Sequence, residues 1–233
     1  MHKLGLIGGT GPESTLLYYR ELTHRVEEKS GALPPLVIES LSVYRVLEYC
    51  QKNDDAGLAA YLLDGINNLA RAGAEAATLT GITPHRVFDR LQAASPLPLI
   101  SMLDVSAAAA VQAGYSKLLL LGTGPTMAGT FARAAFEKRG IEVVVPTPDQ
   151  QATIHHLIAT ELERGIIRPA SQERLLAITR AQVAATGAQA VVLGCTELPL
   201  AFAGKALPVP VLDVLQVHLE QLVKFILAGE IKD

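Results

Sequence analysis

The 233-residue sequence has no run of about 18 apolar residues, the length that a membrane-spanning helix needs. The first residues, up to Gly8, are too short and too rich in glycine for a secretory signal peptide. The formal net charge is only −3, and no basic run or basic-aromatic stripe is present. We therefore predict a cytoplasmic protein with no membrane partner and no nucleic-acid partner.

Cysteine is also scarce, with Cys50 and Cys195 alone in the chain. The two could pair, but the missing export signal favours a reducing compartment in which both thiols stay free. No group of His, Cys, Asp and Glu has the spacing of a metal site, and no nucleophile elbow or comparable hydrolase motif occurs. We therefore predict no metal, and no serine or cysteine hydrolase.

What the sequence does have is an alternation of short apolar runs with longer amphipathic ones, in a chain that is 49% hydrophobic. This alternation is typical of βα units that build a parallel sheet. The predicted strands are residues 4–7, 36–40, 76–80, 97–101, 117–121, 143–145, 190–193 and 209–212. Helices are predicted to begin at Pro12, at Asp54 or Asp55, and at Asp104, Thr126, Asp149, Ser171 and Asp213.

The chain also repeats itself. Residues 3–12 resemble 117–125, and residues 72–79 resemble 186–193 at about the same offset. A third pair, residues 97–105 and 207–214, keeps nearly the same spacing. We therefore predict an α/β protein of two similar three-layer halves, flavodoxin-like or Rossmann-like, related by a pseudo-two-fold axis with the active site between them. The first half is predicted to span 1–96 and 208–233, and the second to span 97–207.

A glycine-rich turn at residues 8–14, Gly-Gly-Thr-Gly-Pro-Glu-Ser, follows the first predicted strand and opens a helix. Backbone N–H groups in such a turn can hold an anion. A dinucleotide fingerprint with Glu39 as its acid is one alternative, and glycines that only turn the chain are another. A similar turn at 122–125 favours a ligand with a carboxylate at each end, so Thr10 and Thr123 are candidate binding residues.

Cys195 is the most informative residue of the chain. It follows an apolar strand at a glycine turn, just before a short predicted helix, and a thiol at a helix N-terminus has a lowered pKa. A buried, inert role is the alternative for any intracellular cysteine. We favour an acid/base role for Cys195 and the inert role for Cys50.

The repeat aligns the Cys195 turn with Thr80, Gly81, Ile82 and Thr83 of the first half. The hydroxyls of Thr80 and Thr83 are candidates for proton transfer there, and His85 is more typical of a capping or supporting group. Arg45 and Arg164 are candidates to clamp a carboxylate in two-pronged fashion. Arg45 is preferred because it follows a predicted strand.

These residues together resemble the aspartate/glutamate racemase family over essentially the whole chain. The resemblance is carried by Gly-Gly-Thr-Gly-Pro-Glu-Ser-Thr at 8–15 and Leu-Gly-Cys-Thr-Glu-Leu at 193–198. It implies two similar α/β halves and no pyridoxal cofactor. One thiol is expected to remove the α-proton of an acidic amino acid, and a second thiol to protonate the opposite face. Dimers are common in the family, so we expect a homodimer.

The chain departs from the family at the first cysteine. Aligning Thr83-Pro84-His85 with the family's Cys-Asn-Thr-x-His turn puts Gly81 at the position of that cysteine. A neutral hydroxyl is a poor base beside a thiolate, because proton transfer is most efficient when the pKa is near the working pH. Two other outcomes therefore stay open. They are a single-cysteine decarboxylase of the arylmalonate decarboxylase type and a weakened homologue that only binds a dicarboxylate.

The resulting hypothesis is a cofactor-independent racemase-family enzyme for aspartate or glutamate. Cys195 is its principal acid/base, and Thr83, with Thr80 as substitute, is the second proton-transfer group. The predicted carboxylate-binding residues are Thr10, Thr123 and Thr196, with Arg45 and then Arg164 for the distal charge. Glu197 is expected to anchor the substrate ammonium or to order the Cys195 turn.

Overall fold

The computed structural model describes residues 1–231, which divide into two compact units. One unit contains residues 1–105 and the C-terminal stretch from His218, and the other contains residues 106–217. The chain therefore passes from one unit to the other twice, within helices α5 (Met102–Gln112) and α11 (Val214–Ala228). No helix among these described residues is long and apolar enough to cross a membrane.

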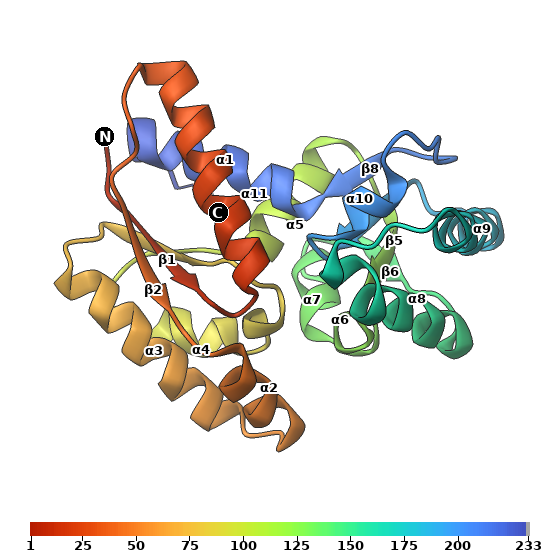
Figure 1. Cartoon of the computed structure of the whole chain (residues 1–233), viewed down its shortest axis with the longest axis horizontal. Helices are drawn as coiled ribbons and strands as arrows, with labels where there is room; N and C mark the ends of the chain where they lie inside the picture. The colour runs from red at the N-terminus through yellow and green to blue at the C-terminus, as the bar shows by residue number, and fades with distance from the viewer. Residues whose placement is uncertain (232–233) are drawn as a thin grey trace. The chain divides into compact units, whose positions relative to one another are not determined.

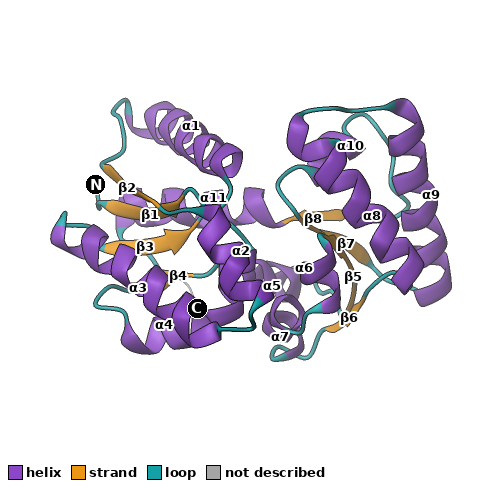
Figure 2. Cartoon of the chain, turned by 60° about the horizontal axis from the view of Figure 1, so that its bottom comes forward, coloured by secondary structure: helices purple, strands orange, loops and turns teal. Residues whose placement is uncertain are grey.

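The first unit is built on a four-stranded parallel sheet in the order β2-β1-β3-β4. Its strands are β1 (Leu4–Gly8), β2 (Leu36–Ser40), β3 (Ala76–Leu79) and β4 (Leu99–Ile100). Helix α1 (Pro12–Ser30) lies on one side of this sheet (Figure 2). Helices α3 (Asp55–Arg71) and α4 (Phe88–Ala94) lie on the other side. Helix α2 (Val43–Gln51) packs against α3, and the short 3-10 helix η1 (Thr83–Val87) follows β3.

The second unit repeats this topology, with the sheet order β6-β5-β7-β8. Its strands are β5 (Lys117–Gly122), β6 (Glu142–Val144), β7 (Ala190–Gly194) and β8 (Val211–Asp213). Helix α7 (Phe131–Glu137) lies on one side of the sheet, and α8 (Pro148–Thr160) and α9 (Pro169–Thr186) lie on the other (Figures 1 and 2). The short helix α6 (Gly124–Ala128) follows β5 and packs against α8. Two short elements, η2 (Leu162–Arg164) and α10 (Leu198–Phe202), complete it.

The central strands are buried along nearly their whole length because helices cover both faces of each sheet. All five residues of β1 and of β7 are buried, as a parallel sheet covered on both faces requires. Each unit has its own apolar core. Leu62 and Ile66 of α3 lie in the core of the first unit, and Leu157 of α8 and Leu176 of α9 lie in that of the second.

Each of the two strands nearest the unit boundaries belongs to the sheet opposite to the one that the sequence predicted. The strand expected to open the second half is β4, which pairs with β3 in the first sheet. The strand expected to return to the first half is β8, which pairs with β7 in the second sheet. The crossing points lie later in the chain than expected, since each crossing occurs inside the helix that follows the last strand of a sheet.

Candidate active site

The turn after β1 begins with a glycine that the fold requires. Gly9 has a φ of +73°, and a Cβ at this position would lie 2.1 Å from the carbonyl oxygen of Leu41. No other residue type fits there without moving the backbone. The amide of Gly9 donates to Thr15 Oγ1 at 2.9 Å, which fixes the turn against the first residues of α1.

Thr80, which follows β3, helps to hold the same turn in place. Its hydroxyl donates to the carbonyl of Ile7 at 3.1 Å and lies 3.2 Å from the hydroxyl of Thr15. Its carbonyl accepts a hydrogen bond from Ser14 Oγ at 2.6 Å. The side chain is fully buried. Thr80 therefore ties the turn after β1 to the turn after β3, and its hydroxyl already has partners within the protein.

His85 also holds the turn after β3, through both of its ring nitrogens. The backbone amide of Met102 donates to His85 Nε2 at 3.2 Å, so Nε2 is the unprotonated nitrogen. The proton is therefore on Nδ1, which donates to the carbonyl of Gly81 at 3.0 Å. Burial lowers the pKa of His85 to about 4, which keeps the ring neutral. His85 is thus the supporting group that the sequence favoured, and Thr83 lies half-buried on the turn it holds.

Thr10 differs from its neighbours. The side chain is 8% exposed, and its hydroxyl oxygen has no hydrogen-bond partner among the residues that the structure describes. Buried polar atoms without a partner are rare, and each one needs an explanation. Thr10 lies in the turn after β1, where the sequence placed a ligand-binding residue.

In the second unit, Cys195 follows β7 as expected and its thiol has a carboxylate for a partner. Sγ donates to Glu197 Oε2 at 2.9 Å. The residue is half-buried and packs against the apolar core of the unit. Cys195 is therefore held at the carboxyl end of a buried strand, as a protonated thiol beside a base.

The expected lowering of the Cys195 pKa was wrong. Burial raises the pKa of this thiol well above its usual value, and the charge of Glu197 together with the hydrogen bond to it raises it further. Helix α10 begins only at Leu198 and has five residues, so its dipole is small and begins past the thiol. The carboxylate and the burial outweigh it.

Two residues that the sequence analysis did not single out lie near this pair. Glu163 of η2 has a pKa raised by partial burial and by the charge of Glu197, and it raises the pKa of Cys195 in turn. The charge of His155 on α8 lowers the pKa of Glu163, as does the charge of Arg164. The second unit therefore has a small charged cluster beside the thiol. In the sequence, its only sign was that Glu163 adjoins Arg164.

The remaining predicted residues of the second unit lie near the ends of β5 and β7. Thr123 precedes α6, and its hydroxyl lies 3.0 Å from that of Thr126. Thr196 lies in the turn between Cys195 and Glu197 and is half-buried. His155 also reaches this region, since a Cβ on Gly124 would lie 3.4 Å from its ring. The β5 and β7 turns thus meet at one edge of the sheet, as the repeat predicted.

Arg45 follows β2, as the sequence indicated, and its side chain contacts two tyrosines. It lies on α2, with its guanidinium carbon 4.2 Å from the centre of the Tyr61 ring and Nη2 donating to the Tyr49 hydroxyl at 3.3 Å. The hydrogen bond with Tyr49 raises the pKa of Arg45. The guanidinium is exposed and held by two tyrosines on the α2–α3 surface.

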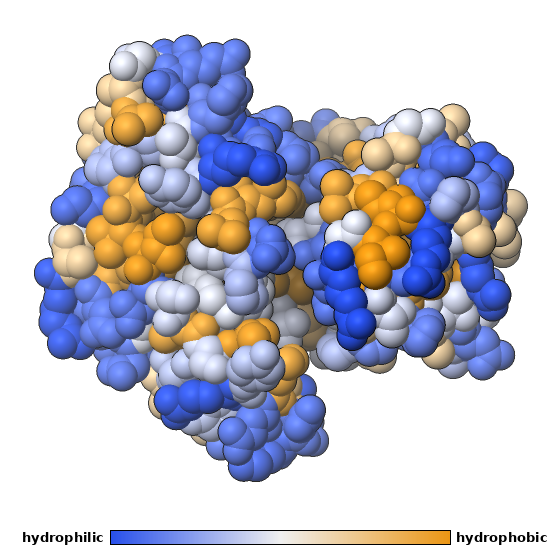
Figure 3. All heavy atoms as spheres, viewed as in Figure 1, coloured by the Kyte–Doolittle hydropathy of each residue, from blue (hydrophilic) through white to orange (hydrophobic). Residues whose placement is uncertain are grey.

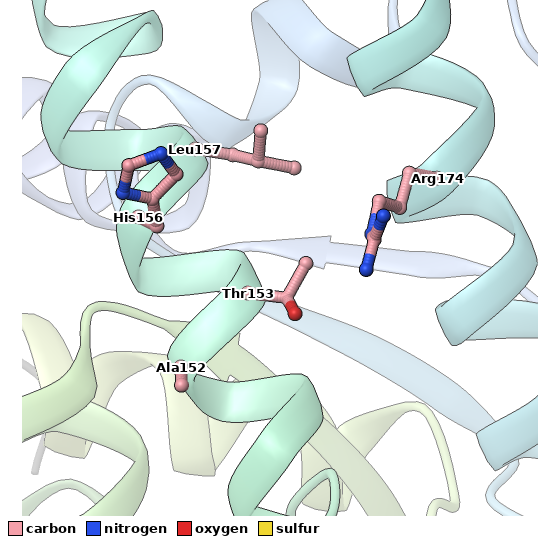
Figure 4. Close-up of a pocket in the computed structure, with 5 residues that line it drawn as sticks. All are labelled: Ala152, Thr153, His156, Leu157 and Arg174. Carbon is pink, nitrogen blue, oxygen red and sulfur yellow. The ribbon is translucent and has the colours of Figure 1, made fainter.

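A surface hollow of about 390 Å³ between α8 and α9 contains none of the predicted residues (Figure 4). It is lined by Ala152, Thr153, His156, Leu157 and Arg174. The Thr153 hydroxyl donates to the carbonyl of Asp149, so it is occupied within the helix. Among residues 1–231 no group of His, Cys, Asp and Glu is arranged to hold a metal, and both cysteines are free.

The fold and these turns match known proteins over nearly the whole chain. The sequence pattern of the Asp/Glu/hydantoin racemase family matches residues 7–222. A candidate Asp/Glu racemase from Yersinia pestis has 33% identity and a TM-score of 0.91, with 97% of this chain and 100% of that chain covered. An aspartate racemase homologue from Pyrococcus horikoshii OT3 has 34% identity and a TM-score of 0.86, with coverages of 99% and 100%.

Two weaker likenesses bear on the possible reactions. The broad specificity amino-acid racemase RacX of Bacillus subtilis is 21% identical over 215 residues, which are 90% of this chain and 92% of RacX. Arylmalonate decarboxylase has 14% identity and a TM-score of 0.55, with 99% and 94% covered, so it shares the fold alone. The family match covers most of the chain and includes both turns described above. The chain is therefore a member of the Asp/Glu/hydantoin racemase family of isomerases.

Proposed function

We propose that this protein interconverts the enantiomers of a small acidic amino acid, aspartate or glutamate, with Cys195 as the principal acid and base. The observation that supports this most directly is the hydrogen bond from Cys195 Sγ to Glu197 Oε2. A thiol beside a carboxylate can lose its proton to that carboxylate without help from a cofactor. The relatives named as amino-acid racemases support the same reaction.

The proposed proton transfer starts from the protonated thiol. The proton on Sγ moves to Glu197 Oε2, and the sulfur keeps the electron pair. The thiolate then takes the α-proton of the substrate, which leaves a carbanion next to the carboxyl group. In the reverse step the thiol returns a proton to the same carbon. Glu197 is therefore proposed to hold the thiol proton and to order the Cys195 turn, rather than to anchor the substrate ammonium.

The substrate carboxylates are proposed to bind at the threonine turns, Thr10 in the first unit and Thr123 and Thr196 in the second. For the distal charge we now prefer Arg164, which lies in the charged cluster of Cys195, over Arg45, which two tyrosines hold. Thr83 stays the proposed second proton-transfer group. Thr80 is the weaker candidate because its hydroxyl already binds Ile7 and Thr15.

The test is exchange of the α-hydrogen in heavy water. The wild-type protein should incorporate deuterium into L- and D-aspartate or glutamate, with loss of optical rotation. Cys195→Ala should lower the rate at least about a hundredfold, which is the usual contribution of a positioned acid or base. Cys50→Ala is the matched control and should keep the rate, because Cys50 packs against the apolar core of the other unit. Full turnover by Cys195→Ala would refute the proposal.

A second candidate reaction is decarboxylation, because the turn after β3 has Gly81 and no thiol. A single thiol suffices to protonate the enediolate left when a malonate loses carbon dioxide. Gas release from a malonate, with no exchange into acidic amino acids, would select the decarboxylase. Binding of a dicarboxylate without either reaction would select the weakened homologue.

We also propose a cytoplasmic homodimer. The two free thiols are consistent with a reducing compartment. The first unit exposes large apolar side chains on α1, with Leu16 63% exposed and Tyr19 51% exposed, and Figure 3 shows apolar areas on the surface. Exposed apolar patches often mark association surfaces. Sedimentation equilibrium would give the mass of the particle, and Leu16→Glu should shift it toward one chain.

A further inference from the structure

The segment of residues 161–168 joins α8 to α9 in the second unit and contains Arg164 (Figure 1). We call it the α8–α9 segment. From Arg164 onward all of its residues are exposed, whereas Glu161 and Leu162 are buried. Leu162 lies in the apolar core of the unit, and η2 packs against α8 and α10. Exposed segments with few apolar contacts open easily, so the closed form of this one depends on its two buried residues.

Glu161 holds the α8–α9 segment at both ends. Its backbone carbonyl, just after α8, accepts from the amides of Arg164 at 3.0 Å and Ile166 at 2.9 Å. Its carboxylate binds residues at the start of α9. Oε1 accepts from Nη1 of Arg168 at 3.0 Å, and Oε2 accepts from Oγ of Ser171 at 2.6 Å. One residue therefore connects the end of α8, the middle of the segment and the beginning of α9.

A carboxylate is an unusual choice for this position. Glu161 follows the last residue of α8, where the negative end of the helix dipole disfavours an anion, and its side chain is only 10% exposed. A buried charge is tolerated when it is paired and its oxygens are hydrogen-bonded, as they are here, but apolar packing would hold a purely structural segment at lower cost. Residues that go against a local preference in this way are expected at functional sites.

The charged residues that the α8–α9 segment brings near the Cys195 turn are Glu163 and Arg164. The charge of Glu163 acts on Cys195, and the charges of Glu197 and Arg164 act on Glu163. The amide of Arg164 is itself one of the donors to Glu161. A guanidinium binds a carboxylate best through two parallel hydrogen bonds, so the orientation of Arg164 matters as well as its charge.

We propose that Glu161 is the positioning residue for Arg164, and that it thereby determines how tightly the site binds the side-chain carboxylate of an acidic amino acid. The inference rests on the proposed function, in which Arg164 receives that carboxylate. Glu161 itself neither contacts the substrate nor transfers a proton. It keeps the α8–α9 segment closed, so that the guanidinium of Arg164 is in place before the substrate arrives.

The first test is the effect of Glu161→Gln on the two kinetic constants. This substitution keeps the size of the side chain and removes its charge, so the contact with Arg168 weakens. The KM for the acidic amino acid should rise at least about tenfold, since a displacement of about 1 Å in a positioning group can cost about a hundredfold. The kcat should stay within about twofold, because binding that is equal in the ground state and the transition state affects KM alone.

Glu173→Gln is the matched control for this substitution. Glu173 lies on α9 and forms a surface ion pair with Lys205, so its variant also removes one charge and one ion pair from this helix. It makes no contact with the carboxylate of Glu161. Glu173→Gln should therefore change neither KM nor kcat, and an equal rise of KM in both variants would overturn the inference.

A double-variant cycle separates positioning from a general loosening of the fold. Arg164→Ala should itself raise KM. Glu161→Gln added to Arg164→Ala should raise KM no further, because the group that Glu161 positions is gone. If the two effects multiply instead, Glu161 acts independently of Arg164 and the inference is wrong. An unchanged KM in Glu161→Gln alone is equally contrary to it.

Trypsin gives a readout of the α8–α9 segment that needs no substrate. It cleaves after arginine but not before proline, so the bond between Arg164 and Gly165 is open to it and the bond after Arg168 is not. Cleavage of a folded protein tracks how often the bond is presented in an open form. Glu161→Gln should therefore speed cleavage after Arg164, measured by mass spectrometry of the fragments. Ser171→Ala removes the 2.6 Å hydrogen bond alone and should speed it less. Wild-type cleavage rates in both variants would overturn the inference.

The outcomes separate this inference from the proposed function. A wild-type protein that exchanges no α-hydrogen of aspartate or glutamate overturns both. A wild-type protein with exchange, whose KM does not depend on Glu161, overturns the inference alone. Circular dichroism at the assay temperature shows which variants are folded, and Ser171→Ala replaces Glu161→Gln in the cycle if the latter is not.

Discussion

The environment of Cys195 shows how neighbouring side chains, rather than a helix, determine the state of this thiol. Burial and a carboxylate 2.9 Å away both favour the neutral form. A second carboxylate, Glu163, acts in the same direction. The thiol therefore rests protonated, ready to act as an acid, and becomes a base only when Glu197 takes its proton.

This balance predicts the effect of Glu197→Gln on the titration of Cys195. The substitution removes a negative charge beside the thiol and keeps the size of the side chain. The pKa of Cys195 should fall, so that the thiolate forms at lower pH than in the parent protein. The measurement is the rate of alkylation by iodoacetamide against pH, made in a Cys50→Ser background so that only Cys195 reacts.

Glu163→Gln is the matched control for that measurement. It removes a more distant charge, so the titration midpoint should shift in the same direction by a smaller amount. An unchanged or higher midpoint in Glu197→Gln would mean that burial alone sets the pKa. The role of Glu197 as proton acceptor would then be lost.

At the residue scale, the sequence predicted where the Cys195 thiol lies but not which neighbours set its pKa. Its place after an apolar strand and before Thr196 could be inferred from the pattern and the repeat. The effect of Glu163 could not, because this residue is over thirty positions earlier and only the fold brings it near. Arg45 shows the converse, since its position after a strand was clear but its contact with Tyr61 of α3 was not.

At the scale of elements, helix α1 is flanked by two glycines with left-handed backbone, Gly9 before it and Gly31 at its end, and the two have different roles. Gly9, in the turn that precedes α1, has a φ of +73° and faces the Leu41 carbonyl. Gly31, which caps the other end, has a φ of +70° and nothing within 4 Å of where a Cβ would lie. The first position is restricted by backbone conformation and by space, and the second by conformation alone.

We therefore expect Gly9→Ala to destabilise the protein more than Gly31→Ala. A left-handed alanine costs about 1–2 kcal/mol, and that should be the whole effect at Gly31. At Gly9 the contact with Leu41 adds to it, so the free energy of unfolding should fall by about 3 kcal/mol or more. Urea denaturation of the two variants measures the difference. Equal losses in the free energy of unfolding would mean that the turn after β1 shifts to accommodate the new Cβ at little cost.

The strands were predicted well because each carries its own signal, a short apolar run. The predicted 36–40 coincides with β2, and the others differ from the observed strands by up to two residues at either end. The sequence did not predict which sheet β4 and β8 join. Both strands are short, and the residues within a strand do not determine which other strand it pairs with. For β4, the pairing of Leu99 opposite Ala77 places the strand in the first sheet, and this register is known only from the folded structure.

At the scale of the whole molecule, the chain is two copies of one topology, and its last helix is returned to the first unit by a buried histidine. Thr78 Oγ1 donates to the carbonyl of Ile100 at 2.7 Å, so at 2.9 Å it accepts from Nε2 of His218. The other nitrogen, Nδ1, then accepts from the Tyr18 hydroxyl at 2.6 Å. His218 of α11 is therefore tied to both α1 and β3 as a neutral ring.

This arrangement predicts that the protein loses stability in mild acid. Burial and the charge of His85 lower the pKa of His218 to about 3, and burial lowers the pKa of His85 to about 4. The unfolded chain takes up protons at these histidines near pH 6.5, whereas the folded protein does not until pH 4 or 3. Stability from each is complete above pH 6.5 and declines below it, by roughly 2 kcal/mol for each at pH 5.

His218→Gln and Tyr18→Phe distinguish this titration from the loss of a contact. Both remove the hydrogen bond between these residues, so both should be less stable than the wild type at pH 7. Only the glutamine variant removes a titrating ring, so its free energy of unfolding should decline less steeply from pH 7 to pH 5, while that of Tyr18→Phe should keep the wild-type slope. Denaturant titrations at several pH values give these slopes. If the glutamine variant keeps the full slope, protonation of His218 is not what weakens the tie between the last helix and the first sheet.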